Sequence, residues 1–408
     1  MITTPPFPTA ATLSLAALVT LMGVPSTLFA QQRTTPLFTA GVGRPTGAAA
    51  TSKRASTPQG AANPRLLPDI SVVGDLIADL SPDGTTQEDG SRLGLREVEL
   101  AVQAAVDPTF RADVFLGFSD AEGVHIEQAF MTATSLPIEV RLGRFLTPFG
   151  KQNTTHRHDL HTIDHSLVVQ RFLGEEGLKS TGLYLGHSLA PFGFFQELIL
   201  TAADRLGEAP EGLVTEEPTS KDVADLAYGA RLRNYWDLSE ASNLEISGSV
   251  LTGLKERELS APIGEVTARA LRQTTLGADV TFRWRPPAQG LYKSFILQSE
   301  FMVQQNEDYD LADSPAPINI GDFTGLYVFG RYQVGRRSYL GARFDTVEDP
   351  EFDGERTNAF SGIWQFYPSE FSKLVAKFER VSPKSFEAFN RFVLQATFAL
   401  GPHKPHPF

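Results

Sequence analysis

The feature that most constrains the fold of this chain is the alternation of short and long connections between its predicted strands. From Asp69 onward, about sixteen segments carry apolar residues at every second position, and they are separated by stretches rich in Gly, Pro, Asp and Ser. Period-two alternation predicts half-buried strands. Connections after even-numbered segments are short, such as DPT at 107 and YPSE at 367, whereas those after odd-numbered segments are mostly longer and polar. Short turns at one rim and long loops at the other are typical of transmembrane β-barrels.

The alternation predicts where each strand lies and which face meets lipid. The predicted strands lie near 69–80, 93–106, 110–118, 124–133, 138–146, 180–188, 194–203, 225–236, 243–253, 273–285, 294–304, 322–333, 338–346, 357–366, 372–380 and 389–400. In the last of them, one face carries Phe392, Leu394, Ala396, Phe398 and Leu400, and the other carries Arg391, Val393, Gln395 and Thr397. A one-residue slip would exchange these faces. Because Arg or Lys at the bilayer midplane costs about 2–4 kcal/mol, the register is strongly fixed.

The predicted fold is therefore all-β, a transmembrane antiparallel barrel of about 16 strands with short periplasmic turns and long extracellular loops. Trp236, Trp284 and Trp364 all fall near the short-turn ends of their predicted strands. Tryptophan concentrates at membrane interfaces, so these residues indicate a periplasmic girdle.

Composition excludes several classes of function. The chain has no cysteine, which excludes disulfides, thiolate metal sites and thiol catalysis. Its formal net charge of -12 argues against nucleic acid as a partner, because phosphate contacts require clustered Lys and Arg.

Two segments precede the predicted barrel, which covers residues 68–408. Residues 1–30 resemble a signal peptide, with an apolar run from Ala10 to Val24 and Ala30 at a cleavage position, although no Lys or Arg precedes Arg33. Its apolar run is too short and too rich in small polar residues for a comfortable transmembrane anchor. Residues 31–67 are rich in Pro, Ala and Gly without periodicity, which predicts a flexible leader.

Several motifs resemble a known family. The runs REVELAVQAAVDPTFRADVFLGF from 96, RLGRFLTPFGKQN from 141 and FLGEEGLKSTGL from 172 are similar to barrels of the phosphate-selective porin O/P-like group. They are closest to the branch labelled zinc-regulated TonB-dependent outer membrane receptor. The resemblance implies a bacterial outer-membrane channel for small polar solutes or ions, in contact with lipid and lipopolysaccharide, and a homotrimer. Phe408 resembles the terminal signal by which the barrel-assembly machinery recognises such chains.

The longest connection, from Leu146 to Lys179, is expected to fold inward as a third extracellular loop that constricts the pore. A loop of this length inside a regular strand pattern is usually functional or disordered. The predicted constriction charges on the loop and on the facing wall are Lys151, Arg157, Arg171, Glu175, Glu176, Arg231 and Arg233.

The same loop holds half of the chain's eight histidines, namely His156, His158, His161 and His165. A short helix from His158 to Val169 would place three of them on one face through spacings of three and four. Such a face suits zinc, copper or nickel, with Asp159 or Asp164 as an oxygen ligand or as a partner that orients a ring. The alternative is that these side chains hydrogen-bond within the folded loop. A metal-linked uptake protein is accordingly the second candidate function, and the sequence implies no other cofactor.

Three further features of the sequence carry expectations. Asp159, His161, Asp164, His165 and Ser166 are the residue types of a hydrolase at the barrel rim, although no specific catalytic motif accompanies them. The tail residues His403 and His406 are expected beyond the last strand, between prolines that prevent ladder pairing. Acidic residues near 307–313 and 348–355 would give the external mouth a negative field.

Overall fold

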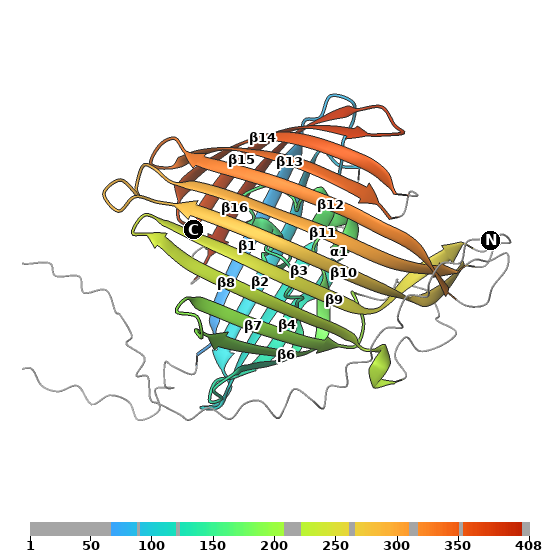
Figure 1. The fold of residues 1–408 in the computed structure, drawn as a ribbon. Coiled ribbons are helices and arrows are strands. Elements are labelled where there is room, and N and C mark those ends of the chain that lie inside the picture. The colour runs from blue at the N-terminus through green and yellow to red at the C-terminus, as the bar shows by residue number, and fades with distance from the viewer. Residues whose placement is uncertain are drawn as a thin grey trace, which may run out of the picture. The chain divides into compact units, whose positions relative to one another are not determined.

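The computed structural model describes residues 67–87, 90–119, 123–207, 222–260, 266–309, 317–350 and 354–401. The predicted signal peptide, nearly all of the leader and the tail histidines His403 and His406 lie outside these residues, as does much of the predicted acidic mouth. The described part is a ring of strands (Figure 1). The strands are β1 (Asp69–Asp79), β2 (Leu93–Ala105), β3 (Phe110–Ser119), β4 (Gly123–Ala133), β5 (Glu139–Leu146), β6 (Lys179–Leu189), β7 (Phe195–Ala203), β8 (Ala227–Ser239), β9 (Ser242–Ser260), β10 (Val266–Trp284), β11 (Phe295–Tyr309), β12 (Pro317–Gln333), β13 (Ser338–Asp349), β14 (Glu355–Ser369), β15 (Ser372–Pro383) and β16 (Phe389–Leu400).

Every strand pairs antiparallel with its sequence neighbours, and β1 also pairs with β16 to close the barrel. At this seam Val72 lies opposite Leu400 and Asp79 lies opposite Val393. The prediction of a sixteen-stranded antiparallel barrel is confirmed. Among the described residues, no helix has the length and apolar character that a membrane crossing requires.

The predicted parity of the connections is present in part, because the connection after β10, from Trp284 to Phe295, is longer than those after β3, from Ser119 to Gly123, and β9, from Ser260 to Val266. β8 and β9 join between Ser239 and Ser242, whereas β5 and β6 are joined by the whole stretch from Leu146 to Lys179. β9 and β10 are longer than predicted, since they extend to Ser260 and begin at Val266. The added part of β9 contains four consecutive charged residues, Lys255 to Glu258, which give no alternation signal, and the strand pairing continues through both extensions.

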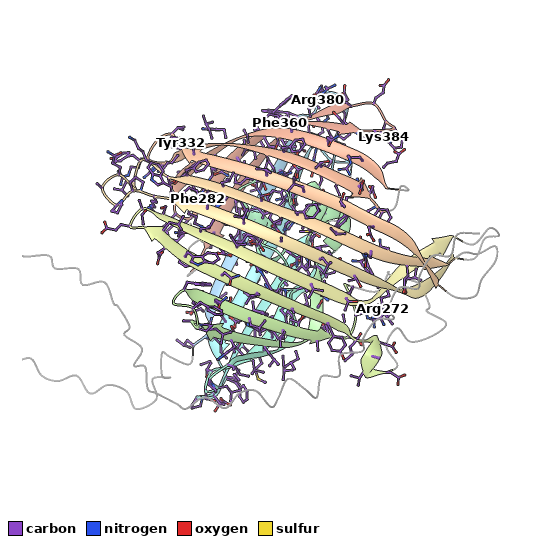
Figure 2. All side chains as sticks on the ribbon, in the orientation of Figure 1. Arg272, Phe282, Tyr332, Phe360, Arg380 and Lys384 are labelled. Atoms are coloured by element: carbon purple, nitrogen blue, oxygen red, sulfur yellow. The ribbon has the colours of Figure 1, made fainter. Side chains whose placement is uncertain are left out.

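The two faces of the wall differ in chemistry as predicted. In β10, Leu276 is 50% exposed on the outer face, whereas Asp279 is 3% exposed on the inner face. Figure 2 shows the labelled Phe282, Tyr332 and Phe360 on the outside of the strands. An apolar exterior and a polar interior are what a lipid-embedded barrel requires.

Two irregularities turn additional polar side chains inward. The β1–β2 register shifts between Asp75 and Leu76, so that Arg96 enters the interior beside the inward-facing Glu97. The β3–β4 register shifts next to Phe115, so that the consecutive residues Glu127 and Gln128 are both buried. A β-bulge redirects a side chain by inserting one extra residue into a strand, and both bulges here supply contacts to the third loop.

Candidate functional site

The third loop folds into the barrel, where Figure 1 shows its green segment within the ring of strands. It contains two 3-10 turns, Gln152–Thr154 and Arg157–Asp159, and the helix α1 (Leu167–Leu173). The apolar side chains of the loop bury themselves against a non-polar area of the inner wall formed by residues that include Met302, Tyr327, Phe329 and Val347. A Cβ at Gly325 would lie 2.4 Å from Val168 Cγ2, so this glycine allows α1 to approach β12 closely.

Backbone groups at both ends of α1 are satisfied by the wall. The Leu167 N–H donates to Asp345 Oδ1 at 3.0 Å, and the Phe172 carbonyl accepts from Gln304 Nε2 at 3.0 Å. Earlier in the loop, the Gln152 N–H donates to Glu300 Oε1 at 2.7 Å. Helix ends leave such groups without intrahelical partners, and burial without a partner would be costly. The wall therefore holds the loop in one position.

Asp164 is the main ionic anchor of the loop. Its carboxylate lies 2.7 Å from Lys377 Nζ, 3.1 Å from an Arg96 nitrogen and 3.7 Å from an Arg391 nitrogen, which come from β15, β2 and β16. Its carbonyl accepts a hydrogen bond from Arg343 at 2.9 Å. Burial alone would raise the pKa of Asp164, but Lys377, Arg391 and Arg96 outweigh it and hold that pKa well below its usual value.

Two cavities lie on opposite sides of the loop. A loop-side cavity of about 630 Å³ is lined by residues of the long connections, such as Thr86 and Gly207, together with Arg157 of the third loop. A turn-side cavity of about 430 Å³ is lined by residues near the short turns, such as Glu139 and Gln103, together with His156 and His158. The consecutive residues Arg157 and His158 of the second 3-10 turn therefore face different cavities, one on each side of the third loop.

The predicted constriction residues are divided between the two cavities. Arg157, Glu175 and Glu176 line the loop-side cavity, and Arg157 pairs with Glu176 at 2.8 Å. Lys151, Arg231 and Arg233 line the turn-side cavity. Lys151 Nζ and Arg233 Nε both bind Glu245 Oε1, at 3.1 and 3.4 Å, and Arg231 pairs with Asp279 at 3.4 Å. Arg171 instead lies beside Asp349 at 3.1 Å and lines neither cavity.

The short helix from His158 to Val169 that would have placed three histidines on one face does not form. The backbone leaves helical geometry at Leu160, with ψ of 147°, and α1 begins at Leu167, after all four histidines. The reason is tertiary, because the segment between the two helical turns extends along the wall so that Asp164 reaches its three cations.

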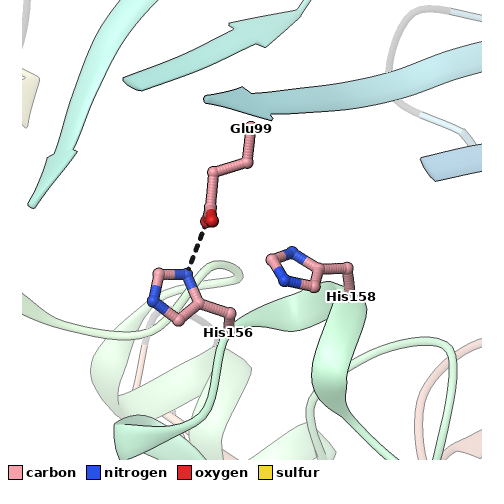
Figure 3. Close-up of side chains that lie close together, drawn as sticks. All are labelled: Glu99, His156 and His158. Atoms are coloured by element: carbon pink, nitrogen blue, oxygen red, sulfur yellow. Dashed lines mark ion pairs between the residues drawn. The ribbon is translucent and has the colours of Figure 1, made fainter. Parts of the chain in front are cut away.

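The loop brings two of the four histidines together with a residue that the sequence analysis did not single out for metal binding. His156 and His158 stack with ring centroids 5.5 Å apart, and Glu99 of β2 faces both of them (Figure 3). Glu99 Oε2 lies 2.8 Å from His156 Nδ1. Burial alone would lower the pKa of His156, but Glu99 and Asp159 outweigh it and raise that pKa to about 9.

The other two histidines are held elsewhere. The His161 ring stacks on Phe329 at 6.2 Å. His165 is fully buried and its Nδ1 lies 3.0 Å from the Glu175 carbonyl. Burial lowers the pKa of His165 to about 4. Ser166, the nucleophile of the hydrolase alternative, is also fully buried, and its hydroxyl lacks a hydrogen-bond partner, so these contacts do not form a catalytic triad.

Sequence reasoning missed Arg96 and Gln128, although one signal was available for each. Strict alternation with the outward Val98 and Leu100 would place Arg96 against lipid, at a cost of about 2–4 kcal/mol near the midplane. A charge on the wrong face of an otherwise regular strand indicates a bulge. The same logic applies to the adjacent polar residues Glu127 and Gln128, since one of them must break the alternation.

No family model matches the chain. An uncharacterized protein of Aquifex aeolicus is 25% identical over 338 residues, which cover 77% of this chain and 70% of that protein.

Solved structures match at low identity but over nearly their whole length. The trimer form of OmpT from Vibrio cholerae has a TM-score of 0.51 at 12% identity, covering 82% of this chain and 100% of that one. DcaP, an outer-membrane channel of Acinetobacter baumannii, has a TM-score of 0.52 at 12% identity, covering 82% and 96%. An anion-selective porin from Comamonas acidovorans has a TM-score of 0.53 at 10% identity, covering 81% and 98%. The chain therefore has the fold of outer-membrane porins, which indicates the bacterial outer membrane as its location.

Proposed function

We propose that this barrel is a diffusion channel for small polar solutes or ions across the outer membrane, with the third loop as its constriction. The observation that carries the proposal is the position of the loop between the two cavities. Both cavities are lined by charged side chains, and the segment from Lys151 to Lys179 contributes to both linings. A solute that crosses the barrel would therefore pass this segment.

The charged side chains that line the two cavities are of both signs, which favours polar solutes without selecting for anions or cations. The loop-side cavity places Arg96, Arg157 and Arg391 near Asp164 and Glu176, and the turn-side cavity places Lys151 and Arg233 near Glu197 and Glu245. Phosphate selectivity, which the sequence resemblance implies, stays a prediction, and so does a homotrimer such as the form in which OmpT of Vibrio cholerae was solved. Metal-linked uptake is the second candidate function, and the cluster of Glu99, His156 and His158 favours it.

The absence of native cysteine allows a direct test of the constriction. Thr154 is exposed in the turn-side cavity and Glu175 is exposed in the loop-side cavity, so each can be replaced by cysteine. In planar-bilayer recordings, a charged thiol reagent should reduce the conductance of Thr154→Cys faster from the turn side and that of Glu175→Cys faster from the loop side.

Phe360→Cys is the matched control, because Phe360 is 60% exposed on the outer face and a thiol there should not alter the current. Full chemical modification of Thr154→Cys and Glu175→Cys, established by mass spectrometry, without any change of conductance would exclude the third loop from the conducting path.

A further inference from the structure

We propose that Glu99, His156 and His158 bind one divalent transition-metal ion at the turn side of the third loop. One ligand atom of each residue lies within 4.8 Å of the corresponding atoms of the other two. Metal–nitrogen and metal–oxygen bonds of about 2.0–2.2 Å place tetrahedral ligand atoms roughly 3.4 Å apart. The three side chains therefore need only small rotations to converge on one ion.

The ligand set is chemically selective. Two imidazoles and one carboxylate suit zinc, cobalt, nickel and copper better than calcium or magnesium, which prefer oxygen ligands. Asp159 Oδ1 lies 3.5 Å from His158 Nε2, where it can orient the ring or complete the coordination shell. The Gln128 amide nitrogen lies 2.7 Å from His156 Nε2, and its amide oxygen accepts from the Leu146 N–H at 3.2 Å. With Nδ1 on the metal, Nε2 would carry the proton, and the Gln128 amide would have to turn over to accept it.

The three proposed ligands are held in place by their surroundings, and an ion can still reach them. Glu99 and His158 are each 3% exposed, and Lys373 Nζ fixes the loop backbone by binding the carbonyls of His158 at 2.5 Å and Leu160 at 3.1 Å. All three proposed ligands line the turn-side cavity of about 430 Å³, which gives an ion a route to them. Glu99 Oε2 pairs with His156 Nδ1 at 2.8 Å, so a metal ion that binds here would displace the proton between them and bind both atoms.

A second cluster of similar composition provides a contrast. Glu97, His125 and Glu127 also lie within 4.8 Å of one another. Lys179 Nζ, however, lies 2.5 Å from Glu127 Oε1 and also binds Glu176 at 2.9 Å. Lys179 is a cation that cannot bind a metal while it is protonated, whereas the group paired with Glu99 is an imidazole that becomes a ligand once it loses its proton. For this reason we assign the metal to Glu99, His156 and His158.

Cobalt is the most informative probe, because its visible absorption reports nitrogen and oxygen ligation directly. Co²⁺ titrated into the full-length barrel, folded in detergent, should give a saturable spectrum at one equivalent that Zn²⁺ displaces. Glu99→Gln and His158→Gln should each weaken the affinity at least tenfold. His161→Gln, on the same loop, and His125→Gln, in the second cluster, should bind as the parent does.

Folding is checked by the mobility of unheated samples on denaturing gels and by circular dichroism. A parent without saturable binding, or folded Glu99→Gln and His158→Gln variants that bind like the parent, would overturn the assignment. Loss of binding in folded His125→Gln would also overturn it and would move the metal to the second cluster. The titration measures binding alone, so its outcome is independent of whether the barrel conducts.

Discussion

Removing the charge of Asp164 should release the third loop from the wall. In Asp164→Asn the carboxylate no longer balances Lys377 and Arg96, which it contacts at 2.7 and 3.1 Å, while the size of the side chain is kept. A hydrogen bond to a charged group contributes about 1.5–3 kcal/mol and a neutral one about 0.5–1.5 kcal/mol. The asparagine amide keeps one acceptor oxygen, so one contact becomes a neutral hydrogen bond and the other is lost. Because the Asp164 side chain is only 20% exposed, docking should weaken by roughly 2.5–4.5 kcal/mol. This corresponds to a factor of about 60–1,600 in the docking equilibrium.

Single-channel recording measures this equilibrium. We expect Asp164→Asn to show more frequent and longer excursions to a higher conductance at neutral pH. Glu175→Gln is the matched control, because it removes one negative charge from an exposed position of the same loop without removing a partner of Lys377. Current traces of folded Asp164→Asn that match those of the parent would refute the view that this carboxylate anchors the loop.

The pH dependence of this anchor has a defined direction. The folded pKa of Asp164 is depressed, so its contribution is fully present above the unfolded value of about 3.9 and is lost as pH falls toward the folded value. Between neutral pH and about pH 4, therefore, Asp164 itself should not titrate, and acid-induced changes in this range must come from other groups.

Three further perturbations have expected outcomes. The folded pKa of buried His165 is about 4, so as pH falls from about 6.5 to 4 its preference for the neutral form should destabilise the loop by up to ~3 kcal/mol; the parent should therefore show more current noise in acid, and His165→Gln should reduce this response. Leu276→Arg should lower barrel stability by about 2–4 kcal/mol in urea unfolding with lipid present, whereas Leu276→Met should not. Gly143→Val should reduce the folded fraction on unheated gels, because Gly143 has φ of 132° and its Cβ would lie 2.2 Å from the Ala129 carbonyl oxygen.

The barrel was predictable because its determinants are local. Alternation fixes the two faces of a strand such as β10 through Leu276 and Asp279, and the cost of a charge in lipid prevents a register slip. The extension of β9 was missed because the charged run from Lys255 to Glu258 shows no apolar alternation, although a hydrogen-bonded ladder can continue through such residues.

The interior of the loop was less predictable, because its determinants are distant in sequence. The three histidines would share a face only on a helix, but the position of α1 is set by packing against the wall and by Asp345, far along the chain from Leu167. The approach of Glu99 to His156 likewise depends on how the third loop packs against the inner wall. A sequence pattern can identify candidate residues, but the fold of the barrel determines which of them are in contact.

The seam between β1 and β16 has a consequence for the order of assembly. Val72 must meet Leu400, so the ring cannot close until the last strand has been synthesised and exported. Until then both terminal strands present unpaired backbone edges, which are prone to pair with other chains. Pairing across so large a separation in sequence is also intrinsically slow. A chain truncated before Phe389 would keep its open edges permanently, so it should aggregate or be degraded and should not insert as a smaller ring.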